Sequence, residues 1–264
     1  MQARLLNEHS DKYLFARQIG AGEPVLILHG LLGSSANWTA VARELAESYS
    51  VFSLDLRNHG RSFHSDLFDY PVMADDVLAF IDQQNLDNIS MIGHSMGGKT
   101  AMQFAYLYPE RINKLVVVDI APRAYPPHNL IAVDALLDLD LATISRLNRA
   151  DAQLQPAIPD TSERLSHLKN LKRGTDGVYH WQVNLKIIRK NYALISDAVD
   201  GGSYPKPCLF IRGVHSDYIQ DADWDDVLEC FPQAELITIP NAGHWVHIQA
   251  RQAFVEKVLD YLDK

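Results

Sequence analysis

Short, mostly apolar runs alternate with helix-length segments along much of the chain, and this alternation restricts the possible fold more than any other feature. The runs lie at 25–28, 51–54, 89–92 and 115–118. Continuous apolar runs of this kind are typical of strands that are buried on both faces. The stretches between them are long enough for the right-handed helical crossovers that parallel strands require. The pattern therefore predicts an α/β fold with a mostly parallel sheet.

The same pattern extends toward both ends of the chain. Further strand candidates lie at 3–7, 13–18, 208–212 and 235–239. Apolar residues at helical spacing indicate helices between the strands. The helix candidates lie at 38–45, 72–84, 96–108, 224–230 and 249–262.

The alternation stops after Asp119, where a long segment without a convincing strand begins. This segment offers helical stretches around 133–148, 162–171 and 182–190, separated by proline and glycine. We interpret residues 121–204 as an all-helical cap, or lid, inserted into a core domain formed by 1–120 and 205–264. An insertion between two strands can cover the carboxyl edge of the sheet, where open α/β sheets bind ligands.

Composition narrows the class of partner. The chain of 264 residues carries 24 basic and 33 acidic residues, a formal net charge of −9, which argues against nucleic acid as a partner. Neither Cys208 nor Cys230 belongs to a metal-ligand pattern, so we expect no metal site and two free thiols in a reducing compartment. No apolar stretch approaches the roughly 18 residues of a membrane span, and Met1 to Asp11 lacks a secretory apolar core. We expect a soluble, cytoplasmic protein.

The pentapeptide GHSMG at 93–97 has the glycine–x–serine–x–glycine pattern and stands between a predicted strand and a predicted helix. This is the context of a nucleophile elbow, in which a strained turn exposes the serine side chain and small flanking residues avoid collisions. Ser95 is therefore the candidate nucleophile. As a lone motif the pentapeptide is a weak signal, and a helix-capping serine is the alternative.

A serine hydroxyl needs an adjacent base near neutral pH, and His244 is the candidate. It lies in NAGHWVH at 241–247, between the last predicted strand and the last helix, and thus at the carboxyl edge that presents Ser95. His247 is the rival, which we place beside the site or on the surface. Because attack on a carbonyl generates an oxyanion, two backbone N–H donors are also expected. Met96, directly after the nucleophile, and Leu31, in the loop after an early strand, are the candidates, and His29 is expected to brace that loop.

Five segments together resemble the α/β-hydrolase superfamily. They are HGLLG at 29–33, DLRNHGRS at 55–62, GHSMGGK at 93–99, VVVDIAP at 116–122 and NAGHWVH at 241–247. The resemblance spans nearly all of the chain outside the cap. It implies an eight-stranded sheet with the cap between the sixth and seventh strands, acyl-ester hydrolysis and no cofactor. We interpret Asp55, Arg57, His59 and Arg61, in the second segment, as structural. Lys99 is expected on the solvent face of its helix and is assigned no chemistry.

The acid of the triad has two candidates. Many α/β-hydrolases place it after the seventh strand in a G-x-x-D pattern, but here Gly213-Val214-His215 is followed by Ser216, and Asp217 comes one residue later. Asp119 directly follows the run 115–118, and the resemblance also implies an acid there. We predict Asp119 and keep Asp217 as the alternative; for Asp119, a strand-end carboxylate that caps the next turn is the competing interpretation.

These residues indicate a serine hydrolase that cleaves small-molecule carboxylic esters or thioesters through an acyl-enzyme, as an acyl esterase or acyl-coenzyme A thioesterase. A carbon–carbon bond hydrolase or a cofactor-free perhydrolase would use the same triad. A catalytically silent ligand-sensing or scaffolding protein is the alternative from another class. Neither the acyl length and leaving group nor the oligomeric state follows from the sequence.

Overall fold

A central sheet of eight strands runs in the order β1-β2-β4-β3-β5-β6-β9-β10 in the computed structural model, which describes residues 2–7, 13–127, 130–199 and 201–264. All neighbours from β4 to β10 are parallel, whereas β2 is antiparallel to both β1 and β4. The predicted mostly parallel, eight-stranded sheet is therefore confirmed. The strands are β1 (Arg4–Leu6), β2 (Ala16–Ile19), β3 (Pro24–Leu28), β4 (Ser50–Leu54), β5 (Ile89–His94), β6 (Ile112–Val118), β9 (Cys208–Gly213) and β10 (Ala234–Ile239).

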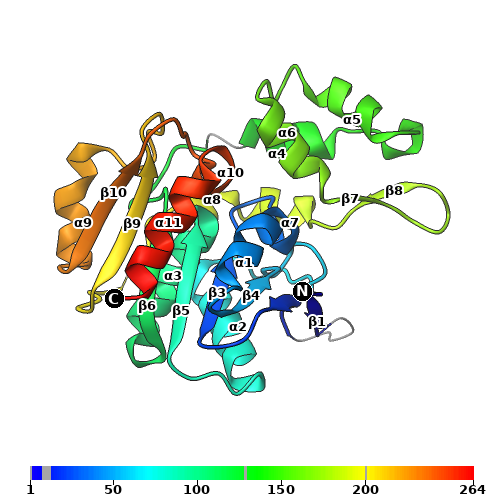
Figure 1. Ribbon diagram of the computed structural model, residues 1–264. Coiled ribbons are helices and arrows are strands. Elements are labelled where there is room, and N and C mark those ends of the chain that lie inside the picture. Colours follow the sequence, from blue (N-terminus) through cyan, green and yellow to red (C-terminus); the bar gives the residue numbers. More distant parts are fainter. Residues whose placement is uncertain (1, 8–12, 128–129, 200) are drawn as a thin grey trace.

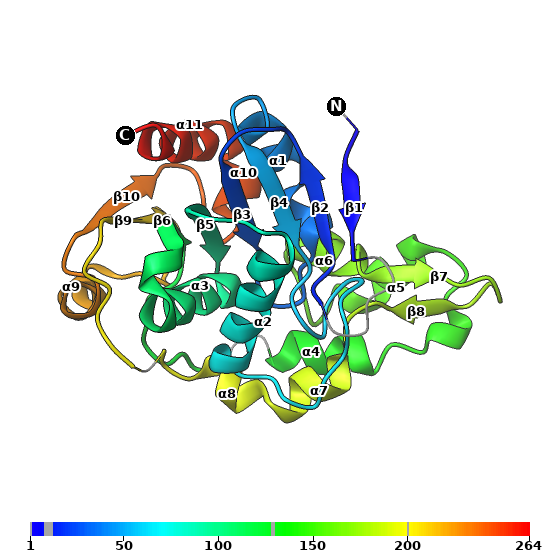
Figure 2. The ribbon, with the colours of Figure 1, turned by 90° about the horizontal axis from the view of Figure 1, so that it is seen from below.

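Helices cover both faces of the sheet (Figure 2). The layer on one face contains α1 (Thr39–Leu45), α10 (Val246–Gln249) and α11 (Arg251–Leu262), and the layer on the other contains α2 (Tyr70–Gln83), α3 (Met96–Leu107) and α9 (Trp224–Cys230). Single-turn 3₁₀ helices are η1 (Ser35–Trp38), η2 (Pro109–Arg111), η3 (Leu141–Thr143) and η4 (Asp221–Asp223).

The strands are apolar throughout because side chains of consecutive residues face opposite layers. In β3, Val25 and Ile27 pack into the layer of α1 and α11, whereas Leu26 and Leu28 pack into the layer of α2 and α3. All four side chains are fully buried. This two-sided burial explains why the strands appear in the sequence as unbroken apolar runs rather than alternating patterns.

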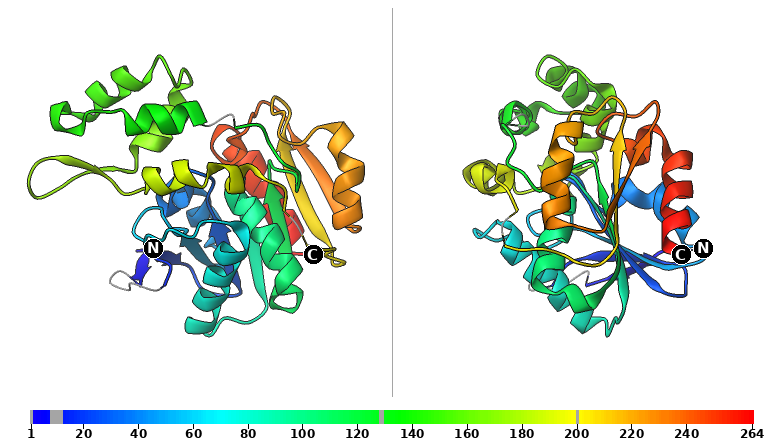
Figure 3. Two further views of the ribbon diagram at one scale, coloured as in Figure 1. Left: turned by 180° about the vertical axis from the view of Figure 1, so that it is seen from behind. Right: turned by 90° about the vertical axis from the view of Figure 1, so that its left-hand side faces the viewer.

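The segment between β6 and β9 lies over one end of the sheet (Figures 1 and 3). We call its part from α4 to α8, residues 130–196, the cap. Its elements are α4 (Leu130–Leu137), α5 (Leu147–Leu154), α6 (Thr161–Leu168), β7 (Leu171–Arg173), β8 (Tyr179–Trp181), α7 (Leu185–Lys190) and α8 (Tyr192–Ser196). An insertion between the sixth and seventh strands of the sheet is confirmed. The division into a core domain of 1–120 and 205–264 and a separate cap domain of 121–204 stays a prediction.

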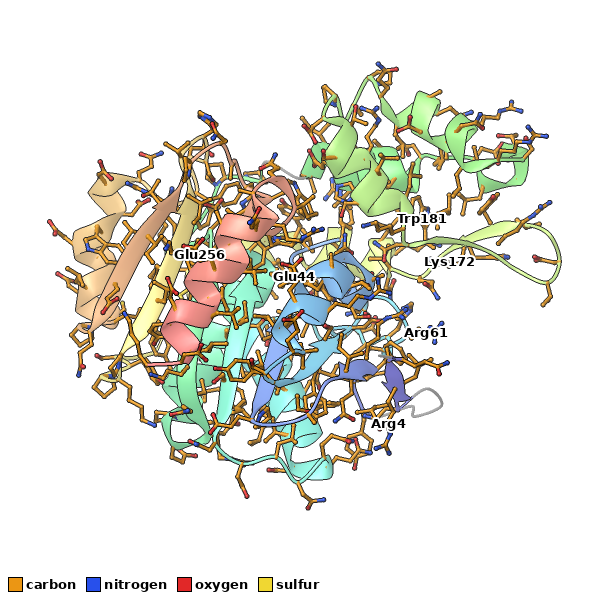
Figure 4. The ribbon with its side chains drawn as sticks, viewed as in Figure 1. Arg4, Glu44, Arg61, Lys172, Trp181 and Glu256 are labelled. Atoms are coloured by element: carbon orange, nitrogen blue, oxygen red, sulfur yellow. The ribbon has the colours of Figure 1, made fainter. Side chains whose placement is uncertain are left out.

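The expectation that the cap holds no strand is wrong, because β7 and β8 form an antiparallel hairpin. Asp176 and Gly177 make its turn: the Asp176 carboxylate accepts the Val178 N–H at 2.9 Å, and Gly177 has a φ of +80°, which favours glycine. Figure 4 shows Lys172 and Trp181 on the two strands of this hairpin.

Two predicted helices are interrupted. The stretch 133–148 contains the end of α4, the short η3 and the start of α5 rather than one helix. Asp140 explains the break, because its carboxylate accepts the Ala142 N–H at 3.2 Å and caps η3. The last helix is divided at Ala250, whose φ and ψ of −131° and 47° are not helical.

Within the described part of the chain, no helix combines the length and apolar character that a bilayer crossing needs. The segment Met1 to Asp11, for which no secretory core was expected, lies partly outside the described residues.

Candidate active site

Ser95 lies at the sharp turn between β5 and α3. Its φ of 52° and ψ of −119° are rare for a residue with a side chain, as expected of a strained nucleophile elbow. The N–H of Ser95 donates to the Val118 carbonyl at 3.0 Å, which ties the turn to the end of β6. A Cβ atom at Gly97 would come within 2.4 Å of the Leu28 carbonyl oxygen, so only glycine lets α3 start this close to β3.

Asp119 and His244 are joined by a hydrogen bond of 2.8 Å between Oδ2 and Nδ1. The Asp119 side chain is completely buried and also accepts the Gly213 N–H at 3.0 Å and the Ser216 hydroxyl. A carboxylate accepts, so Nδ1 of neutral His244 carries the proton and Nε2 carries the lone pair. The ring of Tyr218 stacks on His244, with centroids 3.8 Å apart. This packing and the hydrogen bond together fix the imidazole.

The alternative acid, Asp217, is not brought to His244. It is exposed, and its backbone carbonyl accepts from the Gln220 side chain. Ser216, which stands where the G-x-x-D pattern has its acid, instead donates to Asp119. Asp119 reaches this point because it too has a left-handed backbone, with a φ of 53°.

Two cavities meet at Ser95. The His244 cavity, of about 160 Å³, is lined by Leu31, His94, Ser95, Glu163, His167, Tyr218, His244 and Trp245. The Lys99 cavity, of about 40 Å³, is lined by Leu31, Tyr70, Ser95, Met96, Lys99, Ile120, Tyr125, Tyr192, Ile195 and Tyr218. The cap supplies part of both walls, from α6 in the first cavity and α8 in the second.

The two expected N–H donors, Leu31 and Met96, line the Lys99 cavity together with Ser95. Met96 begins α3, where the helix dipole favours negative charge. Leu31 belongs to a loop that two buried histidines hold: His29 Nδ1 donates to the Gly30 carbonyl at 2.8 Å, and His59 Nε2 accepts the Leu32 N–H at 3.2 Å. Burial lowers the pKa of His29 to about 4 and that of His59 to about 3, so both rings are neutral braces. The bracing role expected for His29 agrees with these contacts.

His247, the rival base, packs against His94 and does not line the cavity that contains Ser95 and His244. Its ring stacks on Trp38 with centroids 4.0 Å apart and an interplanar angle of 3°. Burial lowers its pKa to about 3. The His94 ring contacts the rings of both His244 and His247. His94 also donates from Nε2 to the His244 backbone carbonyl at 2.9 Å, which anchors the loop that carries His244.

The charged residues of DLRNHGRS make structural contacts, as expected. Asp55 accepts the Ser35 N–H at 2.6 Å and the Arg61 N–H at 2.9 Å. Arg57 forms a two-point ion pair with Asp76 of α2, with distances of 2.5 and 2.6 Å. Figure 4 shows Arg61 below the hairpin. Partial burial of Lys172 lowers its pKa, and the positive charges of Arg17 and Arg61 lower it further.

The expectation that Lys99 lies on the solvent face of its helix is wrong, because the side chain is buried. Its exposed fraction is 1%, and its ammonium group donates to the backbone carbonyl of Asp197. Ser95 directly precedes α3, Lys99 lies in the first turns of that helix, and both residues line the Lys99 cavity. The sequence alone assigned no role in the site to Ser216 or Tyr218. Their only signal in the sequence is that they flank Asp217.

Comparison with known proteins gives the family. The family model described as the alpha/beta hydrolase fold matches residues 23–250. The chain therefore belongs to the α/β-hydrolase family, and the predicted resemblance is confirmed.

Relatives with named activities extend over most of the chain. Esterase YbfF of Escherichia coli is 34% identical over 247 residues, covering 91% of this chain and 93% of the relative. An sn-1-specific diacylglycerol lipase of Xenopus laevis, ABHD11, is 36% identical over 253 residues, covering 92% and 80%. A solved structure of a marine microorganism esterase is 42% identical with a TM-score of 0.91, covering 94% of this chain and 99% of that one. The chain is thus an enzyme of the esterase/lipase type that acts on small-molecule esters.

Proposed function

We propose that the chain hydrolyses short-chain carboxylic esters through an acyl-enzyme formed on Ser95. The observation that carries this proposal is the hydrogen bond that His244 donates to buried Asp119, because His244 lines the same cavity as Ser95. A carboxylate in this position holds the imidazole in the tautomer whose Nε2 can accept the serine proton.

The proposed reaction has two balanced halves. His244 Nε2 takes the Ser95 proton while Oγ bonds to the ester carbonyl carbon, and the N–H groups of Leu31 and Met96 stabilise the oxyanion. The carbon–oxygen bond to the alcohol then breaks, and His244 returns the proton to the departing alcohol. Water repeats the sequence on the acyl-enzyme and releases the acid. Since each proton moves between these groups and water, no cofactor or metal is required.

The position of His244 supports an assignment of the two cavities to the two parts of the substrate, the leaving group and the acyl group. The leaving group must lie within reach of the histidine that protonates it. The His244 cavity is therefore proposed to take the alcohol or thiol, and the Lys99 cavity to take the acyl group. Both oxygen and sulfur leaving groups are compatible with this chemistry, so a thioesterase activity belongs to the same proposal.

Ser95→Ala tests the assignment. We expect loss of both p-nitrophenyl acetate turnover and fluorophosphonate labelling, with an unchanged circular dichroism spectrum. Ser48→Ala serves as the matched control and should retain labelling, because this exposed serine lies outside both cavities. Near-normal turnover by Ser95→Ala would refute the proposed nucleophile.

The same assays distinguish the proposed esterase from the alternative functions. A catalytically silent protein would show neither labelling nor turnover. A carbon–carbon bond hydrolase or a perhydrolase would be labelled but would turn over vinylogous diketones, or form peracids from peroxide, faster than simple esters.

A cytoplasmic location is also proposed. It is supported by the two free cysteines, of which Cys208 is buried, since unpaired thiols are usual in reducing compartments. Burial raises the Cys208 pKa to about 12, so this thiol stays protonated and unreactive.

A further inference from the structure

Lys99 is a buried cation whose charge is only partly compensated. Its ammonium nitrogen lies 5.6 Å from the ring centroid of Tyr70 and 4.8 Å from that of Tyr125, and it donates to one backbone carbonyl, that of Asp197. Within the described part of the chain, no carboxylate lies within ion-pair distance of it. Buried lysines are rare unless they are paired, because an ammonium group loses much of its hydration.

The location of this cation relates it to the acyl group. Lys99, Tyr70 and Tyr125 all line the cavity that also contains Ser95 and Met96. Under the proposed function, on which this inference rests, that cavity receives the acyl chain. Its other walls include Ile120 and Ile195, so the ammonium group is the main charged feature an acyl chain would meet there.

The geometry points to an anion-binding subsite at Lys99 that recognises acyl groups ending in a carboxylate. The preferred substrates are then monoesters of short dicarboxylic acids, with the ester carbonyl at Ser95 and the free carboxylate on the Lys99 ammonium. The phenol rings of Tyr70 and Tyr125 flank this position.

The titration of Lys99 is consistent with an anion-binding role. Burial lowers its pKa to about 7, only partly offset by the charge of Asp197, and Arg123 lowers it further. A bound carboxylate would add the opposite charge and favour the protonated amine. The subsite would therefore be most strongly charged when it is occupied.

Paired substrates provide the test. Monomethyl glutarate and methyl valerate have the same acyl chain length and differ at the far end, where one has a carboxylate and the other a methyl group. We expect wild-type kcat/KM for monomethyl glutarate to exceed that for methyl valerate by about tenfold or more, the effect of a charge-assisted hydrogen bond. Dimethyl glutarate, which hides the charge, should behave like methyl valerate.

Lys99→Met should abolish this preference, because kcat/KM for monomethyl glutarate should fall about tenfold or more relative to kcat/KM for methyl valerate, and Lys99→Arg should retain part of the preference. Lys206→Met is the matched control: Lys206 also donates to backbone carbonyls, those of Pro109 and Ile112, but lies outside this cavity. If Lys99 only tethers the chain near Asp197, Lys99→Met will lower both activities equally, which overturns the inference.

The outcomes also separate the inference from the proposed function. Turnover of methyl valerate without a preference for the carboxylate ester overturns the subsite and leaves the esterase intact. Absence of turnover of all esters overturns the proposed function, and calorimetric binding of glutarate against valerate then decides the subsite alone. The wild-type comparisons remain decisive even if Lys99→Met does not fold.

Discussion

At the scale of single residues, the carboxylate of Asp119 has three hydrogen-bonding partners, and one of them is the catalytic candidate His244. Replacing it by asparagine retains the shape but allows the opposite histidine tautomer. Asp119→Asn should therefore lower kcat by up to roughly 10⁴-fold, by analogy with serine proteases. Asp217→Asn should stay within about twofold of wild type, since Asp217 is exposed and lies apart from His244. Steady-state kinetics with p-nitrophenyl acetate would measure both.

The opposite ranking of these two variants would place the acid at Asp217. A large loss in both would instead indicate that the loop after β9 acts as a unit, which circular dichroism and thermal melting would reveal.

Residues with local sequence signals were easier to predict than residues that depend on the packing of distant segments. Ser95 and His244 belong to short motifs next to predictable strands, so their shared edge followed from the parallel topology. The choice between Asp119 and Asp217 depends on the direction of two side chains, which the left-handed backbone of Asp119 and the Ser216 hydroxyl determine. The burial of Lys99 depends on Tyr70, Tyr125 and the chain near Asp197, all far away in the sequence.

At the scale of elements, α10 contacts η1 through the stacked rings of His247 and Trp38. Both ring nitrogens of His247 are buried without a hydrogen-bond partner among the described residues. His247→Phe retains the aromatic stack and removes these two nitrogens. It should raise the free energy of unfolding by about 1–3 kcal/mol, the cost of an unsatisfied buried polar group.

The gain should be larger at pH 5 than at pH 8. An unfolded histidine binds a proton below its ordinary pKa of about 6.5, whereas folded His247 does not until about pH 3. The unfolded chain thus binds more protons, and wild-type stability falls by up to about 1.4 kcal/mol per pH unit below 6.5 through this residue. Urea denaturation at both pH values would measure this, with exposed His180→Phe as control. An equal gain at both pH values would contradict the burial of a neutral ring.

The hairpin of β7 and β8 shows a limit of sequence interpretation at the element scale. Asp176-Gly177 is a strong turn signal, but the flanking strands have three residues each and carry lysine, arginine and histidine. Such short, polar strands lack the apolar character that made the sheet recognisable. Their pairing is stabilised by the turn and by contacts with neighbouring elements rather than by local preference.

At the scale of the whole molecule, we expect the cap to limit the size of the acyl group. The Lys99 cavity, closed partly by α8, is small, with a volume of about 40 Å³. Among neutral p-nitrophenyl esters, we expect kcat/KM to be highest for acyl chains of up to about six carbons and to fall for dodecanoate, because longer chains must displace the cap. A series from acetate to palmitate would measure this. A maximum at palmitate would show that the cap opens in solution.

The core sheet could be predicted from the sequence because its strands are buried on both faces and separated by regular crossovers. The cap could not be predicted to the same extent. Its helices are short, and their packing onto the core uses single contacts such as Asn170 to the Leu32 carbonyl and Tyr70 to the Ile195 carbonyl, at 2.5 Å each. These contacts have no periodic signature.

The hydrogen bond between Ser216 and Asp119 has a consequence for how such active sites can diverge. The ends of β6 and β9 bring both side chains to one point beside His244, so a carboxylate supplied from either strand would occupy nearly the same place. Ser216→Asp is a change at one position that would give this point a second acid. A protein lineage that acquired this second acid could then lose Asp119. The acid of the triad would move from the end of β6 to the loop after β9, and no intermediate protein would lack an acid.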